Sequence, residues 1–143
     1  MIKISIMITP ISIVIPYSYS DDTLCIWMQK RLSDPFKGLW EFPGGKIEES
    51  EDPVMGAIRE VKEEVGILLG PQDLKLFTVE HTFPKASKTI SLFVFLTDKL
   101  ELFPTENRFV LQCEEDILAI KHQIPGPNIN IFGMLETYLK QMA

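Results

Sequence analysis

The chain has 143 residues, of which 45% are hydrophobic and 24% are charged. This apolar content excludes an intrinsically disordered protein, and the length lies in the range of one domain, which we expect to span residues 1–143. The formal net charge of -6 works against nonspecific binding to nucleic acid, which needs a cationic surface. We therefore expect no stable nucleic-acid partner.

An isoleucine-rich segment, residues 2–15, could be taken for an export signal or a membrane span. Pro10 and Pro16 interrupt it, and no cleavage site of small residues follows, so neither is expected. Its period-two pattern favours a strand with a bulge or bend after Pro10. Cys25 and Cys113 lack zinc or disulfide spacing, so we expect two reduced core thiols in a cytoplasmic protein without membrane association.

Apolar patterns and turn residues predict the elements of the remaining chain. These are a turn over residues 17–23, a strand over 24–29, a loop over 30–38, a strand over 39–42, a helix over 52–65, strands over 74–83 and 90–98, and a final helix capped by Asn128. The apolar run over residues 92–96 is typical of a buried central strand. The final helix carries Phe132, Leu135 and Leu139 on one side. Residues 105–115 show no clear pattern and are left unassigned. Periodicity alone indicates an α+β protein.

The helix over residues 52–65 has the strongest signal. Asp52 can act as N-cap, Pro53 suits the first helical position, and Gly66 provides the stop. The apolar residues recur at three- and four-residue spacing, which places them on one face towards the core. The other face is free for chemistry.

Three glutamates crowd that polar face, because Glu60 lies one turn from both Glu63 and Glu64. A solvated acidic face is the ordinary explanation for such a cluster. Here, however, the helix follows a Pro-Gly-Gly loop at residues 43–45, where glycines let phosphates approach the backbone closely. Carboxylates on a rigid element suit Mg²⁺ or Mn²⁺, so this stretch predicts a metal site that handles phosphates.

Residues 45–67, GKIEESEDPVMGAIREVKEEVGI, resemble the Nudix box, G-x5-E-x7-R-E-U-x-E-E-x-G-U, in which U is a bulky aliphatic residue. All nine specified positions are filled, by Gly45, Glu51, Arg59, Glu60, Val61, Glu63, Glu64, Gly66 and Ile67. The resemblance implies an α/β Nudix fold, in which a mixed sheet is sandwiched between α-helices.

The resemblance also implies roles for the box residues. Glu60 and Glu64 would bind Mg²⁺ together with the carbonyl of Gly44, and Glu63 would contribute another ligand. Glu60 is the usual candidate for activating water in members similar to MutT, although members differ in which glutamate is the base, and Glu63 is the second candidate.

The remaining box residues are structural by the same resemblance. Arg59 and Glu51 look like a buried ion pair that holds the loop against the helix, which is consistent with the need of a buried charge for a partner. Gly45 and Gly66 shape the two ends of the loop and helix.

Residues 38–46 resemble the segment before the box in MutT-type members, which remove oxidised guanine nucleotides. Lys30 stands in the place of a phosphate-binding arginine, with Arg31 beside it as a substitute. Glu41 and Phe42 belong to the same nucleotide-binding segment. Phe42, like the neighbouring Trp40, is a candidate for stacking on a base, although an aromatic at a strand end is more often part of the core.

Asn128 matches an asparagine that reads the purine edge in MutT, because its amide offers both a donor and an acceptor. A plain helix N-cap is the alternative. Pro35 stands where the MutT pattern has a histidine. The pose of the nucleotide is therefore expected to differ in part from the MutT pattern.

We expect a Mg²⁺-dependent enzyme that hydrolyses a nucleoside triphosphate to the monophosphate and pyrophosphate. 8-oxo-dGTP is a candidate substrate, which would connect the protein to DNA repair. The alternatives keep the box but change the substrate to ADP-ribose, a dinucleoside polyphosphate or the 5′ end of RNA. A non-catalytic Nudix-fold binding module is a further alternative, against which the complete glutamate set argues.

Overall fold

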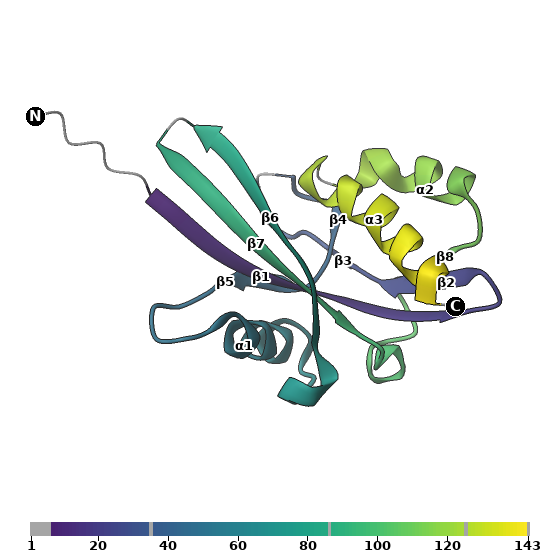
Figure 1. Ribbon diagram of the computed structural model, residues 1–143, viewed down its shortest axis with the longest axis horizontal. Helices are drawn as coiled ribbons and strands as arrows, with labels where there is room; N and C mark the ends of the chain where they lie inside the picture. Colours follow the sequence, from purple (N-terminus) through teal and green to yellow (C-terminus); the bar gives the residue numbers. More distant parts are fainter. Residues whose placement is uncertain (1–6, 35, 86, 125, 143) are drawn as a thin grey trace, which may run out of the picture. The chain divides into compact units, whose positions relative to one another are not determined.

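The computed structural model describes residues 7–34, 36–85, 87–124 and 126–142 (Figure 1). The chain divides into two compact units, which we describe separately. The first comprises Met1–Ile15 and Pro43–Thr97, and the second comprises Pro16–Phe42 and Asp98–Ala143. Strand β1 (Met7–Ser20) continues from the first unit into the second. The isoleucines expected at the start of this strand, within residues 1–6, lie outside the described residues.

The first unit combines strands with the helix predicted above. Its elements are the N-terminal part of β1, β5 (Gly44–Lys46), α1 (Pro53–Val65), the 3-10 turn η1 (Pro71–Asp73), β6 (Lys75–Lys85) and β7 (Lys88–Thr97). β6 and β7 form a long antiparallel hairpin, and β7 neighbours β1. β5 pairs antiparallel with β1, with Ile11 opposite Lys46 and Ile13 opposite Gly44. This pairing fixes the start of the loop that leads to α1.

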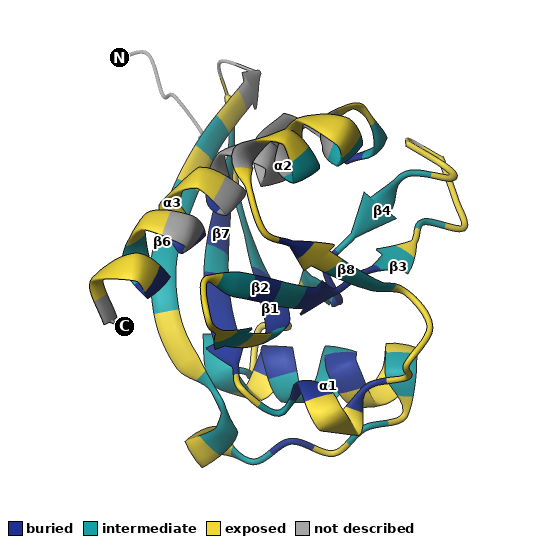
Figure 2. Cartoon of the chain, turned by 90° about the vertical axis from the view of Figure 1, so that its right-hand side faces the viewer, coloured by how far each residue is buried: buried dark blue, intermediate teal, exposed yellow. Residues whose placement is uncertain are grey.

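The core of the first unit follows the predicted apolar patterns. Leu92 and the run Val94–Leu96 of β7 are buried, as predicted for a buried central strand. In α1 the buried residues include Ala57 and Val61, and Figure 2 shows both buried and exposed segments along this helix. β1 continues through Pro10 as a single strand, and the predicted bulge there stays a prediction.

The second unit contains a small set of strands and the C-terminal helices. Its elements are the end of β1, β2 (Thr23–Trp27), β3 (Gln29–Lys30), β4 (Trp40–Glu41), the 3-10 turn η2 (Leu100–Leu102), β8 (Arg108–Leu111), α2 (Glu114–Ile120), the 3-10 turn η3 (Lys121–Gln123) and α3 (Gly126–Met142). β2 pairs antiparallel with both β1 and β8. β3 and β4 form a separate antiparallel pair.

The turn predicted over residues 17–23 is wrong in its extent. Residues 17–20 belong to β1 and pair with residues 23–26 of β2, which leaves only Asp21 and Asp22 in the turn. Both have positive φ angles, 50° and 58°, as the central residues of the two-residue hairpin turn that matches strand twist. The polar residues before the turn lie on a strand that alternates between exposed and half-buried positions. Their polar composition therefore wrongly indicated a turn.

The C-terminal part differs from its prediction at two places. β8 and α2 occupy the stretch around residues 105–115 that carried no clear pattern. α3 begins at Gly126, so Asn128 is its third residue and the prediction that it caps the helix is wrong. A proline is tolerated in the first turn of a helix because its missing N–H has no partner there, which lets α3 start before Asn128.

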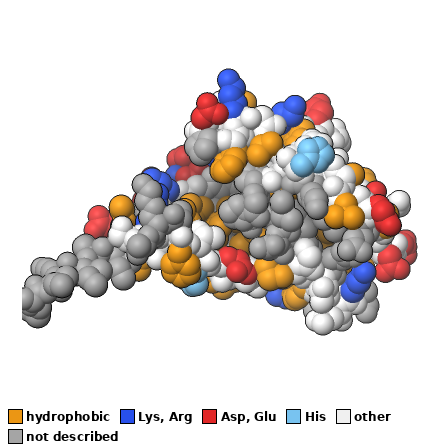
Figure 3. Space-filling view, turned by 90° about the horizontal axis from the view of Figure 1, so that it is seen from above, with side chains coloured by type: hydrophobic (Ala, Val, Ile, Leu, Met, Phe, Trp, Pro, Cys, Tyr) orange, Lys and Arg blue, Asp and Glu red, His pale blue; other side chains and the backbone are white. Residues whose placement is uncertain are grey.

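α3 buries a regular apolar stripe made of Ile131, Leu135 and Leu139, which includes the two leucines predicted to face the core. The side chain of Phe132, also predicted for this stripe, lies outside the described residues. Among the described helices, none is long and apolar enough to cross a membrane. The face in Figure 3 carries acidic and basic side chains interspersed with hydrophobic ones.

Candidate active site

Both ends of α1 are defined by the residues predicted to define them. The Asp52 side chain accepts a hydrogen bond from the Met55 backbone N–H at 2.8 Å, and Pro53 occupies the first turn. Gly66 adopts a φ of 80° and its N–H donates to the Lys62 carbonyl at 2.9 Å, a conformation that favours glycine. The three glutamates of the polar face therefore lie on a helix with fixed ends.

The two glycines before α1 lie at close approaches, Gly44 to backbone atoms and Gly45 to a side chain. A Cβ on Gly44 would overlap the carbonyl oxygen of Ser12 and lie 2.8 Å from the Cα of Ile13. A Cβ on Gly45 would lie 2.6 Å from the carboxyl carbon of Glu60. Gly44 thus lets the backbone of β5 contact that of β1, and Gly45 leaves the space that the Glu60 carboxylate occupies.

Arg59 lies at the centre of a network of acceptors. Its Nε donates to Glu51 Oε2 at 2.8 Å and its Nη2 to Glu51 Oε1 at 3.0 Å, which is a bidentate pair. Nη2 also donates to the Lys46 carbonyl at 3.0 Å. The side chains of Glu51 and Arg59 are only 10% and 23% exposed. The structure therefore joins the loop before α1 to the helix through the two residues predicted to form a buried ion pair.

The ion pair shifts the pKa values of both partners towards their charged forms. The hydrogen bond from Arg59, followed by that from the Glu48 backbone N–H, holds the pKa of Glu51 below its ordinary value. The hydrogen bond to Glu51, followed by that to Glu60, raises the pKa of Arg59. At neutral pH the pair is therefore ionic on both sides.

The lowered pKa of Glu51 predicts a dependence of stability on acid pH. A carboxylate with a lowered pKa stabilises the fold above its ordinary pKa of 4.5, and that contribution is lost as pH falls through the lowered value. We expect Glu51→Gln to lower the melting temperature at about pH 7, with a difference from the wild type that shrinks below about pH 4.5. Thermal unfolding across this range measures it, with the exposed Glu101→Gln as control. An unchanged difference at about pH 3 would contradict the prediction.

The glutamates of the polar face are held by hydrogen bonds. Arg59 Nη1 donates to Glu60 Oε1 at 3.0 Å and to Glu63 Oε2 at 3.1 Å, while Glu64 Oε2 accepts from the Gly44 N–H at 3.4 Å. The Glu60 side chain is 15% exposed and that of Glu63 is 59% exposed. Arg59 thus places a positive charge beside two of the three glutamates. This role of Arg59 was not predicted, although its i,i+4 spacing from Glu63 is a local signal for it.

The chemistry of this donor set fits Mg²⁺, although the side chains do not converge on one point. Within the described part of the chain, no group of three or more His, Cys, Asp or Glu side chains is arranged to hold a metal ion. Glu60, Glu63 and Glu64 offer hard oxygen ligands on neighbouring turns of one helix, and the Glu60 carboxylate lies directly beside Gly45. Arg59 Nη1 donates to Glu60 Oε1 and Glu63 Oε2, so the other oxygen of each carboxylate is the one that would bind the ion.

The predicted nucleotide-binding residues belong to the second unit, whereas the glutamates belong to the first. Arg31 Nη1 lies 3.0 Å from Glu41 Oε2. Phe42 is 3% exposed, so it is a core residue, which was the alternative to stacking on a base. Lys30 is exposed. Asn128 lies in α3, and its side chain is outside the described residues, as is Pro35 altogether.

Of the residues that the structure describes, the two cysteines and His81 are not part of the hydrogen-bond network around Arg59. Cys25 is half-buried, and burial raises its pKa. Cys113 is exposed, so the prediction of a core thiol is wrong there, because Cys113 lies in the connection between β8 and α2, neither of which was predicted. His81 lies on β6 with its Nδ1 2.9 Å from Ser91 Oγ on the neighbouring β7.

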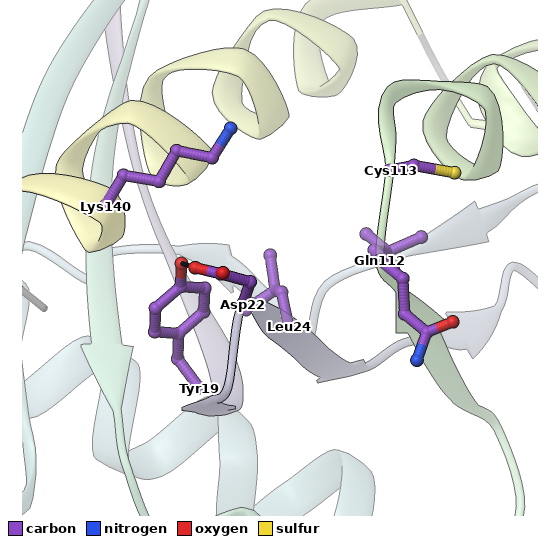
Figure 4. Close-up of a pocket in the computed structure, with 7 residues that line it drawn as sticks. Tyr19, Asp22, Leu24, Gln112, Cys113 and Lys140 are labelled. Atoms are coloured by element: carbon purple, nitrogen blue, oxygen red, sulfur yellow. Dashed lines mark hydrogen bonds between the residues drawn. The ribbon is translucent and has the colours of Figure 1, made fainter.

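The second unit also contains a pocket of about 280 Å³, shown in Figure 4. The Tyr19 hydroxyl donates to Asp22 Oδ1 at 3.3 Å on one side of it, and Lys140 lies on α3 across from them. The described lining residues are Tyr19, Asp22, Leu24, Leu111, Gln112, Cys113 and Lys140. None of them was predicted to bind nucleotide or metal.

Comparison with known proteins identifies the family. The NUDIX domain family model matches residues 9–128, a range that includes the whole loop, α1 and most of the described strands. The chain therefore belongs to the NUDIX domain family. This match, together with the strands and helices described above, confirms the predicted α/β Nudix fold with a mixed sheet.

Individual relatives resemble the chain over about half of its length. It is 43% identical over 74 residues to the 8-oxo-dGTP diphosphatase of Proteus vulgaris, covering 52% of this chain and 65% of that protein. It is 37% identical over 73 residues to the dihydroneopterin triphosphate diphosphatase of Escherichia coli (strain K12), covering 51% of this chain and 47% of that protein. The chain thus matches less than two thirds of the length of either relative.

A solved MutT structure, from work on the Aliivibrio salmonicida and Vibrio cholerae proteins, has the same fold. The two chains align with a TM-score of 0.63 at 22% identity, over 92% of this chain and 98% of that one. At this identity the likeness concerns the fold.

Proposed function

We propose that this protein is a Mg²⁺-dependent hydrolase of nucleoside triphosphates, which it converts to the monophosphate and pyrophosphate. The observation that carries the proposal is the complete box in its folded form, with the Glu60 carboxylate against the glycine loop and bound by Arg59. A binding module would have no use for three carboxylates on one helix face. Mn²⁺ is an alternative metal of the same chemical class.

Each box residue has a proposed task. Glu60, Glu63, Glu64 and the Gly44 carbonyl would hold the metal ion. When bound, Mg²⁺ screens the phosphate charge and lowers the pKa of the attacking water. Glu60 accepts a proton from that water while the water oxygen forms a bond to an internal phosphorus. The phosphoanhydride bond at this phosphorus breaks, and the products are the nucleoside monophosphate and pyrophosphate. Glu63 is the second candidate for the base.

Arg59 is proposed to orient Glu60 and is not proposed to contact the substrate. Its bidentate bond to Glu51 leaves Nη1 directed at Glu60 and Glu63. A carboxylate held in one orientation is a better proton acceptor than a freely rotating one, because catalysis depends on placing the reacting groups. Glu51 and Arg59 therefore contribute to the reaction through Glu60.

We propose 8-oxo-dGTP as the first substrate to test, with a role in nucleotide-pool repair in the cytoplasm. The 43% identity to an 8-oxo-dGTP diphosphatase supports this choice. Dihydroneopterin triphosphate is the second candidate, because a relative at 37% identity acts on it, and both molecules carry a triphosphate. The proposed nucleotide-binding residues are Lys30, Arg31, Glu41, Phe42 and Asn128.

Steady-state hydrolysis with Mg²⁺ tests the proposal. The panel comprises 8-oxo-dGTP, dGTP, the other nucleoside triphosphates, dihydroneopterin triphosphate, ADP-ribose and diadenosine tetraphosphate. We expect turnover that stops on chelation of the metal, with the highest kcat/KM for 8-oxo-dGTP. A higher kcat/KM for another substrate would change the proposed substrate within the family. No turnover of any member would favour a binding module.

A further inference from the structure

Ser12 is a polar residue in the buried part of β1. It is fully buried and lies between Ile11 and Ile13 of the isoleucine-rich strand. A hydroxyl that is removed from water without a hydrogen bond destabilises the fold, so a buried serine needs a partner. The Ser12 hydroxyl donates to the Pro53 carbonyl oxygen at 2.7 Å, across 41 residues of sequence. This side chain therefore bonds the strand to the first turn of α1.

Backbone hydrogen bonds on both sides of Ser12 hold the glycine loop. The Val14 N–H donates to the Pro43 carbonyl at 2.9 Å. The Ile47 N–H donates to the Pro10 carbonyl at 3.0 Å. The chain is thus bonded to β1 both before and after the two glycines, and the loop cannot move without this strand.

Ser12 and the Glu60 carboxylate lie on the same face of the β1–β5 pair. Ser12 is directly opposite Gly45 in this antiparallel pairing, and the side chains of opposite residues project from the same face. A Cβ on Gly45 would meet the Glu60 carboxylate, so that carboxylate lies on the face from which the Ser12 hydroxyl reaches α1. Contacts on this face therefore decide where Glu60 is held.

The bond from Ser12 complements another contact between α1 and the strands. Arg59 Nη2 donates to the Lys46 carbonyl of β5 at 3.0 Å, and Arg59 is the residue before Glu60. Ser12 acts at the start of the same helix, on Pro53. A helix that is held at one position can pivot about it, whereas a second position removes that freedom. The direction of α1, and with it the place of Glu60, depends on both contacts.

We propose that Ser12 is a positioning residue for the reaction, because through Pro53 it holds α1 where Glu60 and the Gly44 carbonyl can share a metal ion. The proposal rests on the proposed function, which supplies the metal ion and the reaction. A misplacement of reacting groups by about 1 Å can lower a rate by a factor on the order of 10². Ser12 acts through α1 and is not proposed to contact the metal ion or the substrate.

Ser12→Ala in the full chain tests the proposal, because it removes the hydroxyl and keeps the Cβ. We expect kcat on the best substrate of the panel to fall about tenfold while KM changes less than about twofold, since the metal ligands and the base are displaced. Mn²⁺ affinity without substrate, measured by electron paramagnetic resonance, should fall about tenfold. Ser12→Cys keeps a weaker donor of similar shape and should give intermediate values.

Ser91→Ala is the matched control. Ser91 is also a buried serine on a strand of the same unit, and its Oγ lies 2.9 Å from His81 Nδ1. Both alanine variants lose a buried hydroxyl and should lower Tm by similar amounts. Ser91→Ala should nevertheless leave kcat and Mn²⁺ affinity unchanged, because its partner is not part of α1. Circular dichroism verifies that each variant is folded.

The proposal is overturned if Ser12→Ala retains the kcat or the Mn²⁺ affinity of the wild type, if Ser91→Ala loses as much of both, or if the wild type binds no Mn²⁺. The substrate panel fails separately. Wild-type turnover that Ser12→Ala leaves unchanged would refute the role of Ser12 and support the proposed function. Absence of turnover, together with Mn²⁺ binding that Ser12→Ala weakens and Ser91→Ala does not, would refute hydrolysis and retain Ser12 as the residue that positions the metal ligands.

Discussion

Glu60→Gln is expected to lower kcat on the preferred substrate by a factor on the order of 10² to 10⁴, the range typical for loss of a general base. The amide keeps the shape of the side chain and an oxygen that can accept from Arg59 Nη1, the bond that measures 3.0 Å in the structure. It removes the negative charge and the ability to take up a proton. The measurement is steady-state hydrolysis with Mg²⁺, with thermal unfolding to verify that the fold is kept.

Glu49→Gln is the matched control, because Glu49 is an exposed glutamate of the loop before α1 and loses the same charge. Its kcat should remain within about twofold of the wild type. Glu63→Gln distinguishes the two candidate bases, since the larger loss of kcat should belong to the base. A kcat of Glu60→Gln close to that of the wild type would rule out Glu60 as base.

Gly44→Ala is expected to destabilise the protein by about 1–3 kcal/mol or more, as for overpacking of a filled space. The added methyl group would overlap the Ser12 carbonyl oxygen and lie 2.8 Å from the Ile13 Cα. These are backbone atoms of β1 and cannot rotate away, so β5 would have to separate from β1. Hydrolysis should fall as well, because the Gly44 carbonyl is a proposed metal ligand. Urea unfolding measures the first effect and the nucleotide panel the second.

Gly133→Ala adds the same methyl group at a glycine where, among the described residues and apart from the adjacent helix backbone, no atom lies within 4 Å of the new Cβ. Gly133 lies inside α3, and replacing a helical glycine with alanine stabilises by roughly 0.5–1 kcal/mol. Gly44→Ala should therefore lower the free energy of unfolding, whereas Gly133→Ala should raise it. Equal effects would show that the close approach at Gly44 relaxes without cost.

The helix that carries the glutamates could be predicted because its signals are local. Asp52, Pro53 and Gly66 act through their own backbone conformation and hydrogen bonds within a few residues, and apolar spacing defines the buried face. By contrast, the end of β1 looked like a turn, because Tyr17–Ser20 is polar and its strand conformation depends on pairing with β2. β8 was missed for the same reason, since its four residues are a strand through their pairing with β2.

The sequence by itself determined the family, the caps of α1 and the set of glutamates on its polar face, since these depend on spacing along one helix. Only the tertiary structure decided the partners of these groups. In the structure Arg59 bonds to Glu51 on one side and to Glu60 and Glu63 on the other. Arg31 forms an ion pair with Glu41, and Lys30 lies over the Trp40 ring. Such contacts depend on which strands and loops meet, and the pairing of residues distant in sequence is not encoded in local spacing.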